Sequence, residues 1–167
     1  MIRRAVAILV LLGAVLVSAP AYADRVVIPS LGVNAEIVEV GVSGSTQDMP
    51  RSLWTVGHWK RGVKPCAPGS TVLAGHTYEG GRAVFNGLGR LRKGAVVRIE
   101  RPGPDCTYRV TANYVQPRSE SVASCYSWDG PARGCLITCV GRIGPGNYTH
   151  RRIVKIVLRN RLTSTSR

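Results

Sequence analysis

One cysteine of the chain occupies a position suited to a nucleophile. Cys139 ends an apolar stretch and Gly141 follows two residues later, so the thiol is expected where a strand opens into a loop that a substrate can approach. A thiol becomes a useful nucleophile at neutral pH only when a neighbour favours the thiolate or accepts its proton. His76 is the candidate partner, because it also follows a glycine at the end of an apolar stretch, residues 70–74. On spacing alone, a disulfide at Cys139 and a surface role for His76 remain open alternatives.

The N-terminus predicts export. Arg3 and Arg4 form a positive region, residues 5–17 are apolar but shorter than the ~20 residues of a membrane span, and Ala21-Tyr22-Ala23 is a typical signal-peptidase site. We predict that residues 1–23 are a signal peptide cleaved after Ala23. The protein is then secreted or held in the cell envelope, on the extracytoplasmic face. An uncleaved membrane anchor is the alternative.

Export bears on the other cysteines. The chain has 5 cysteines, and an odd number in a secreted protein indicates one thiol left for chemistry or for intermolecular pairing. The remaining four can form two disulfides in three ways. A short closed loop favours Cys125–Cys135, which leaves Cys66–Cys106 as the second pair.

The composition argues against several classes of function. No set of His, Cys, Asp or Glu has the spacing of metal ligands, and no glycine-rich phosphate loop precedes a helix, so we expect neither a metal nor a cofactor. The net charge of +14 attracts anions, but the basic residues are scattered and no aromatic stacking motif accompanies them. A solvated basic surface is therefore favoured over a nucleic-acid site. We interpret His58 and His150 as structural residues.

The rest of the sequence predicts one β-rich domain. Residues 24–162 are apolar enough for a core and rich in glycine and proline, and residues 163–167 form a tail. Seven or eight short strands are expected, which favours a closed or half-closed barrel with one or two helical turns. The expected extended segments are residues 25–28, 33–40, 54–59, 70–74, 95–101, 107–115, 135–140 and 150–159.

Three motifs, in order along the chain, resemble those of the sortase family around its histidine, its cysteine and its arginine. The cysteine motif is similar to TLxTC, with Cys135 in place of the first Thr. The matching segments are VLAGH (72–76) with AVFNGLGRLRKG (83–94), LITC (136–139), THRRIV (149–154) and, at the opening strand, IPSLGV (28–33). The resemblance covers roughly residues 25–160, and the histidine motif looks closest to the actinobacterial class F and class E groups.

The resemblance implies both a fold and a reaction. Sortases are eight-stranded β-barrels that cut an LPxTG-like cell-wall sorting signal between Thr and Gly, form a thioester and pass the acyl group to an amine. Carried over to this chain, Cys139 is the nucleophile, His76 is the acid and base, and an arginine stabilises the oxyanion. The expected partners are a sorting-signal peptide and an amine acceptor, either a wall precursor or a pilin lysine. We expect a monomer associated with the membrane or the cell wall, whose extra cysteines staple loops.

Two adjacent arginines, Arg151 and Arg152, compete for the oxyanion role. Alternation along the last strand places Arg152 on a purely apolar face, whereas Arg151 shares a mixed face with Ile153. A guanidinium aimed into the core without a partner is costly, so parity favours Arg151. By the same parity Ile137 lies on the face of Cys139. Ile137 and Ile153 are therefore predicted to line the peptide groove.

Two other functions compete with this hypothesis. An L,D-transpeptidase also uses a cysteine and a histidine, but its Ser/Thr-His-Gly-Cys run is absent. A non-catalytic, disulfide-stapled basic module that binds anionic cell-wall polymer is the main alternative. It predicts that Cys139 is disulfide-bonded, whereas the sortase hypothesis requires a free thiol at Cys139 and four paired cysteines.

Overall fold

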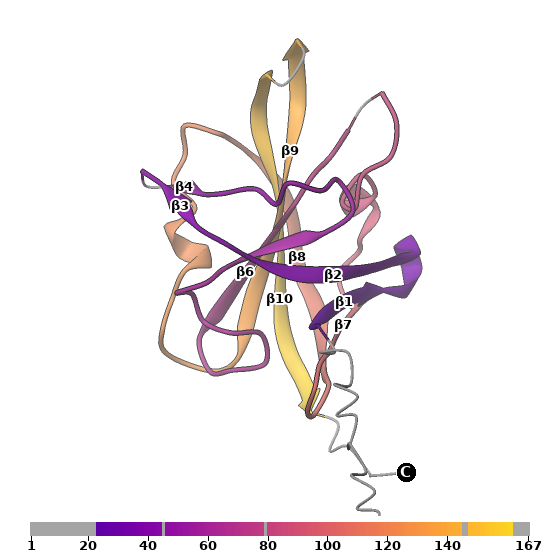
Figure 1. Cartoon of the computed structure of the whole chain (residues 1–167), viewed down its shortest axis with the longest axis vertical. Helices are drawn as coiled ribbons and strands as arrows, with labels where there is room; N and C mark the ends of the chain where they lie inside the picture. Colours follow the sequence, from indigo (N-terminus) through magenta and orange to yellow (C-terminus); the bar gives the residue numbers. More distant parts are fainter. Residues whose placement is uncertain (1–22, 45, 79, 145–146, 162–167) are drawn as a thin grey trace, which may run out of the picture.

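Eight strands close into a barrel, in the order β1-β2-β5-β6-β9-β10-β8-β7 (Figure 1). The computed structural model describes residues 23–161 apart from residues 45, 79, 145 and 146. The barrel strands are β1 (Arg25–Ile28), β2 (Val33–Val40), β5 (Val56–Trp59), β6 (Ser70–Gly75), β7 (Val96–Glu100), β8 (Cys106–Pro117), β9 (Arg133–Gly144) and β10 (Asn147–Arg161). The predicted mainly β fold with an eight-stranded barrel is therefore confirmed.

The remaining regular elements are short. A hairpin of β3 (Val42–Ser43) and β4 (Thr46–Gln47) lies between β2 and β5, outside the extended segments predicted from the sequence. Three single 3₁₀ turns make up the helical part of the described chain, namely η1 (Pro29–Leu31), η2 (Leu88–Arg90) and η3 (Ala123–Cys125). β9 and β10 extend beyond their predicted ends. They pair with each other over nearly their whole length, and the hydrogen bonds of this ladder keep the polar ends of both strands extended. In Figure 1 this pair runs through the length of the molecule.

Two parallel pairs, β2 with β5 and β6 with β9, interrupt an otherwise antiparallel barrel. A parallel pair requires a crossover connection. For β2 and β5 it is residues 41–55, and for β6 and β9 it is the long chain between Gly75 and Arg133. Because of this crossover, β6 and β9 lie side by side although they are far apart in the sequence. The two strands run in the same direction, and β9 continues to Gly144, beyond the end of β6 at Gly75.

The barrel interior is filled by inward-facing apolar side chains. Every second residue of β7 and of the first half of β8 is buried, as the period of a strand requires. Tyr108 is fully buried, and its hydroxyl accepts the amide of Cys66 at 2.8 Å. The largest fully buried side chains are Tyr108, Phe85, Ile28, Leu73, Leu88, Ile99, Leu136 and Ile156, with Ile153 in a separate cluster.

That separate cluster lies on the outer face of the barrel, beneath the chain between β8 and β9. Val72, Cys125, Cys135 and Ile153 are its buried members, with Tyr126 and others packed against them. The disulfide Cys125–Cys135 fastens the connecting chain to β9. This outer cluster therefore holds the connection against β6, β9 and β10.

The disulfides follow the pairing that loop length favoured. Cys125–Cys135 closes a sequence separation of 10 residues, and Cys66–Cys106 closes one of 40. Cys139 carries a free thiol. Cross-links of this kind typically stabilise a small domain by about 2–4 kcal/mol, mainly by restricting the unfolded chain.

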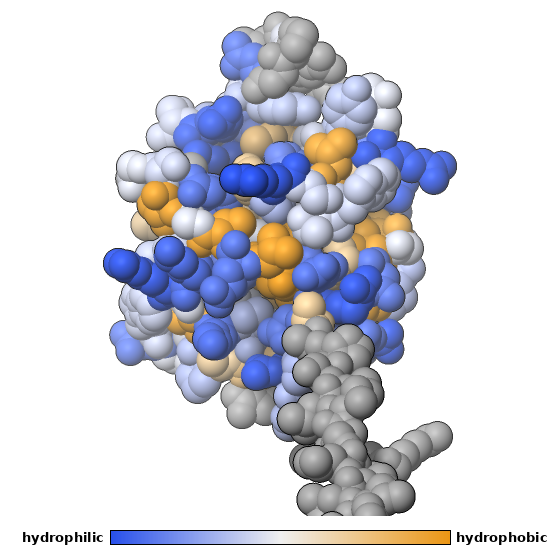
Figure 2. All heavy atoms as spheres, in the orientation of Figure 1, coloured by the Kyte–Doolittle hydropathy of each residue, from blue (hydrophilic) through white to orange (hydrophobic). Residues whose placement is uncertain are grey.

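Most basic side chains face solvent. Arg98–Glu100, with a nitrogen–oxygen distance of 3.4 Å, is the only salt bridge found in the described part of the chain. The face in Figure 2 is mostly hydrophilic, with apolar side chains gathered in a few patches across its middle.

Residues 1–22 of the predicted signal peptide and the predicted tail, residues 163–167, lie outside the described residues. Within residues 23–161, four gaps aside, no helix has the length and apolarity to cross a membrane.

Candidate active site

Neighbouring strands bring the predicted site residues together. In the barrel β6 pairs with β9, β9 with β10, and β10 with β8. Arg151 on β10 lies directly opposite Cys139 on β9, and Gln116 on β8 lies on the other side of Arg151. Paired residues project from the same face of a sheet, and adjacent strands lie about 4.8 Å apart. The thiol and the guanidinium therefore belong to one row across the outer face.

His76 extends this row from the parallel strand. The ladder between β6 and β9 ends two residues before His76 on one strand and two residues before Cys139 on the other. Continuing that register brings His76 beside Cys139 and onto the same face. The buried hydroxyl of Thr138 donates to the carbonyl of Gly75 at 2.7 Å, so the two chains stay in contact beyond the ladder.

The residues around His76 explain why glycine precedes it. A Cβ on Gly75 would lie 2.5 Å from Cδ2 of Phe85 and 2.8 Å from Cγ1 of Val84. The amide of Phe85 in turn donates to the carbonyl of His76 at 3.0 Å. The AGH and AVF parts of the histidine motif are thus one packing unit. Phe85 and Val84 pack against the glycine, and the amide of Phe85 holds the backbone of His76.

We predict that Gly75→Ala destabilises the protein by about 1–3 kcal/mol and lowers peptide turnover, because the added methyl must displace Phe85 and with it the backbone of His76. Thermal unfolding and peptide cleavage measure the two effects. Gly144→Ala is the matched control, since a Cβ there would have nothing within 4 Å. Wild-type melting temperature and turnover in Gly75→Ala would contradict this account of the motif.

The ring of His76 is held by a backbone carbonyl. Its Nε2 lies 2.7 Å from the carbonyl oxygen of Pro50. A carbonyl oxygen only accepts, so Nε2 carries the proton in this contact and Nδ1 is the nitrogen left for proton exchange. The Met49–Pro50 segment therefore sets both the tautomer and the orientation of the imidazole, which no feature of the sequence indicated.

Arg151 is anchored by the turn that follows β8. Its Nη1 donates to the carbonyls of Arg118 at 3.1 Å and Glu120 at 3.4 Å. The buried side chain of Gln116 donates to the carbonyls of Glu120 at 3.4 Å and Ser121 at 3.2 Å, which straps the same turn. Guanidinium has five N–H donors, so anchoring through Nη1 leaves those on Nε and Nη2 for a ligand. Gln116 was missed in the sequence, because its partners are backbone carbonyls, which carry no sequence signal.

Arg152 points to the opposite side of β10. Its Nη1 donates to Oδ1 of Asn113 at 2.9 Å, and its guanidinium lies against Gly89, where a Cβ would be 3.2 Å from Cζ. Asn113 also donates to the carbonyl of Leu91 at 2.8 Å. Arg152 therefore joins β10 to the chain around η2 and lies away from the row that contains Cys139.

A cavity of about 690 Å³ opens over Cys139 and Arg151. Its floor comes from β6 and β9, and its wall is the stapled chain between β8 and β9. Ile137 lines this cavity, whereas Ile153 is only 1% exposed and packs beneath it in the outer cluster. The lining residues are Gln47, Met49, Val72, Ala74, Arg118, Ser119, Glu120, Ser121, Val122, Ala123, Tyr126, Ile137, Thr138, Cys139 and Arg151.

Tyr126 closes the apolar part of the cavity. Burial raises the pKa of its phenol above the ordinary value, against an opposing effect of the Arg151 charge. The phenol therefore stays protonated at neutral pH and donates to Oε1 of Gln47 at 3.3 Å. The cavity is thus cationic at the Arg151 end, with a neutral polar group at Tyr126.

The other two histidines have structural partners. His58 is 4% exposed, and its Nε2 lies 2.9 Å from the carbonyl oxygen of Val63. Nδ1 of His150 lies 2.7 Å from the hydroxyl of Thr149. Among the described residues, no group of His, Cys, Asp and Glu could hold a metal ion.

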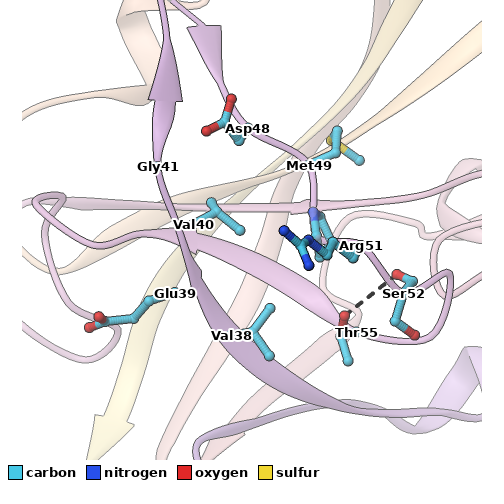
Figure 3. A pocket seen from close by; sticks show the side chains of 10 residues that line it. Val38, Glu39, Val40, Gly41, Asp48, Met49, Arg51, Ser52 and Thr55 are labelled. Atoms are coloured by element: carbon cyan, nitrogen blue, oxygen red, sulfur yellow. Dashed lines mark hydrogen bonds between the residues drawn. The ribbon is translucent and has the colours of Figure 1, made fainter.

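A second hollow, of about 720 Å³, lies between β2 and the chain of residues 48–55 (Figure 3). Met49 lines both spaces, but Cys139 and Arg151 do not line this one. Glu39, Asp48 and Arg51 give it a mixed charge. Cys139 and Arg151 therefore face the first cavity and not the second.

Comparison with known proteins defines the class of this barrel and site. The sortase domain family model matches residues 26–159, and the chain belongs to the sortase family, a family of cysteine transpeptidases. Sortase C-1 from Actinomyces oris is similar at 28% identity and a TM-score of 0.64, over 82% of this chain and 73% of that one. Comparison with curated proteins gives no match.

Two further solved structures share the fold. Sortase A from Listeria monocytogenes has 22% identity and a TM-score of 0.67, over 86% of this chain and 92% of that one. The pilus-related sortase C of Group B Streptococcus has 20% identity and a TM-score of 0.65, over 86% and 70% of the two chains. The family expectation is confirmed, and the class F or class E subtype stays a prediction.

Proposed function

We propose that this sortase cleaves an LPxTG-like sorting signal between Thr and Gly and transfers the acyl part to an amine. The observation that carries the proposal is the row of a free thiol at Cys139 between Arg151 and His76, at the edge of a cavity large enough for a short peptide. The alternative of a non-catalytic wall-binding module required Cys139 in a disulfide. The structure instead pairs the other four cysteines with one another.

In the proposed mechanism the thiolate of Cys139 attacks the threonine carbonyl carbon. A C–S bond forms, and the carbonyl electron pair moves to oxygen as a tetrahedral oxyanion. The intermediate collapses to a thioester as the C–N bond breaks, and the imidazolium of His76 gives its proton to the departing glycine amine. An incoming amine then attacks the thioester, gives its proton to His76 and releases the Cys139 thiolate.

Arg151 is proposed to stabilise the oxyanion in both halves of this reaction. Its anchoring to the carbonyls of Arg118 and Glu120 supports the role, because a donor that is already oriented needs no reorganisation when charge develops. A guanidinium also stays charged at every working pH. The donors on Nε and Nη2 are the ones assigned to the oxyanion.

We further propose that the protein works outside the cytoplasm, as a secreted or envelope-associated monomer. Two disulfides favour an oxidising compartment, since they persist there and are rare in the cytosol. The acceptor is proposed to be a primary amine of a wall precursor or of a pilin lysine.

Internally quenched peptides test the proposal. A panel with LPxTG-like sequences is incubated with the purified chain, with and without an amine such as triglycine. We expect cleavage after Thr, detected by fluorescence, and with the amine a ligated product identified by mass spectrometry. No turnover across the panel, with the Cys139 thiol shown to be free, would refute the proposed substrate class.

A further inference from the structure

A row of three aromatic rings continues from the cavity to the protein surface. Tyr126 lines the cavity, Trp59 packs edge-on against Tyr126 with ring centroids 6.3 Å apart, and Trp128 packs against Trp59 at 6.2 Å. Trp128 is 62% exposed. Neither indole takes part in the proposed reaction. Exposed indoles beside a binding cavity are the residue type that most often anchors a partner.

The exposed indole is presented on anchored backbone. The amide of Ser70 on β6 donates to the carbonyl of Ser127 at 2.7 Å, and the amide of Gly69 donates to that of Gly130 at 2.9 Å. Trp128 lies between these two fastened points, and its ring is supported by Trp59 at an interplanar angle of 65°. A side chain held in this way loses little conformational entropy on binding.

A sorting motif bound with its cleavage site at Cys139 and its first residue toward Tyr126 would leave the cavity at this row. The cavity extends from Cys139 past Ile137 to Tyr126. Tyr126 directly follows Cys125, which is bonded to Cys135 on β9. Cys135 precedes Cys139 by four residues of β9, a span of about 13 Å at the rise of a strand. Four extended substrate residues, the number before the cut in the proposed motif, cover the same span. The next residues upstream then reach Trp59 and Trp128.

We infer that Trp59 and Trp128 bind an acidic, proline-containing segment directly N-terminal to the sorting motif. Extended proline-containing chains dock on exposed aromatic rings, because their preformed conformation costs little entropy to bind. Lys60 and Arg61 directly follow Trp59 and are exposed, and neither takes part in the salt bridge found among the described residues. Carboxylates in the substrate segment would therefore find cationic partners beside the two indoles. This inference rests on the proposed function and names the part of the substrate that lies beyond its motif.

Three peptides with one common LPxTG-like motif test the inference on the full chain. One peptide carries the motif alone, one adds an upstream segment alternating Pro and Glu, and one adds a Gly-Ser segment of equal length. We expect kcat/KM to be about fivefold to tenfold higher for the Pro-Glu peptide than for the other two, the size of one good aromatic contact. Trp128→Ala should remove this gain and leave turnover of the motif-only peptide unchanged.

Trp54→Ala is the matched control, because Trp54 is 59% exposed and lies outside the aromatic row. It should keep the gain. Equal kcat/KM for the Pro-Glu and Gly-Ser peptides, or a gain that survives Trp128→Ala, would overturn the inference.

Direct binding separates failure of this inference from failure of the proposed function. The Pro-Glu segment without any motif is titrated onto the full chain and followed by tryptophan fluorescence. Saturable binding that is lost in Trp128→Ala supports the proposed binding surface at Trp59 and Trp128, even if no peptide is cleaved. Absence of binding, together with absence of a kinetic gain, overturns it.

Discussion

Changing Cys139 to alanine is expected to abolish peptide cleavage and amine transfer, with a loss of at least about 10³-fold in kcat/KM. No other group in the row can form the acyl intermediate, and water attack on the unactivated amide is slow. Peptide fluorescence measures the loss, and mass spectrometry should show no acyl-enzyme. The melting temperature should stay near the wild-type value, because the side chain is small and only partly buried.

The control for this variant is Val140→Ala, the next residue on β9, whose side chain projects to the other face. It should keep most of the activity. Thiol alkylation of the oxidised protein should label one cysteine in the wild type and none in Cys139→Ala, since the other four are paired. Residual turnover in Cys139→Ala, or a disulfide at Cys139 in the isolated protein, would rule out the thiol mechanism.

Arg151→Ala is expected to lower kcat/KM by about 10²–10³-fold, the cost of losing one oriented oxyanion donor. The effect should fall mainly on kcat, because the charge it stabilises develops in the transition state. Arg151→Lys should recover only part of the rate, since an ammonium is a point charge that cannot keep the Nη1 contacts to Arg118 and Glu120 while it reaches the oxyanion.

Arg152→Ala is the matched control. It removes the hydrogen bond to Asn113 and should cost about 1 kcal/mol of stability with little change in kcat. Steady-state kinetics and thermal unfolding of the two alanine variants separate the roles. A larger loss of kcat in Arg152→Ala than in Arg151→Ala would reverse the assignment.

The sequence was informative wherever an inference depended on local periodicity. β1 and β2 were predicted with their observed bounds, because alternation and the turn at residues 29–32 are local features. Parity within β10 separated Arg151 from Arg152, since successive residues of a strand must face opposite sides. The spacing of Cys125 and Cys135 favoured their disulfide, because a short loop keeps two thiols close even in the unfolded chain.

Long-range placement was decided only by the folded barrel. Ile153 follows the predicted parity yet lies beneath the cavity, because the chain stapled by Cys125–Cys135 folds over it. The contacts of His76 with Pro50 and of Arg151 with Glu120 join segments about 26 and 31 residues apart, at backbone carbonyls that carry no sequence signal. Gln116 was missed for the same reason, and Trp59 was missed because its ring partners, Tyr126 and Trp128, lie far from it in the sequence.

Cys139 shows most clearly which properties the sequence determined and which the folded barrel decided. Its sequence context alone predicted a free thiol among five cysteines and a family motif. The predicted strand end at Cys139 is wrong, because pairing with β10 continues β9 as far as Gly144. Which groups stand beside the thiol depended on the pairing of β9 with β6 on one side and β10 on the other. Strand pairing is a property of the whole barrel, because each register is set by hydrogen bonds and core packing contributed by distant parts of the chain.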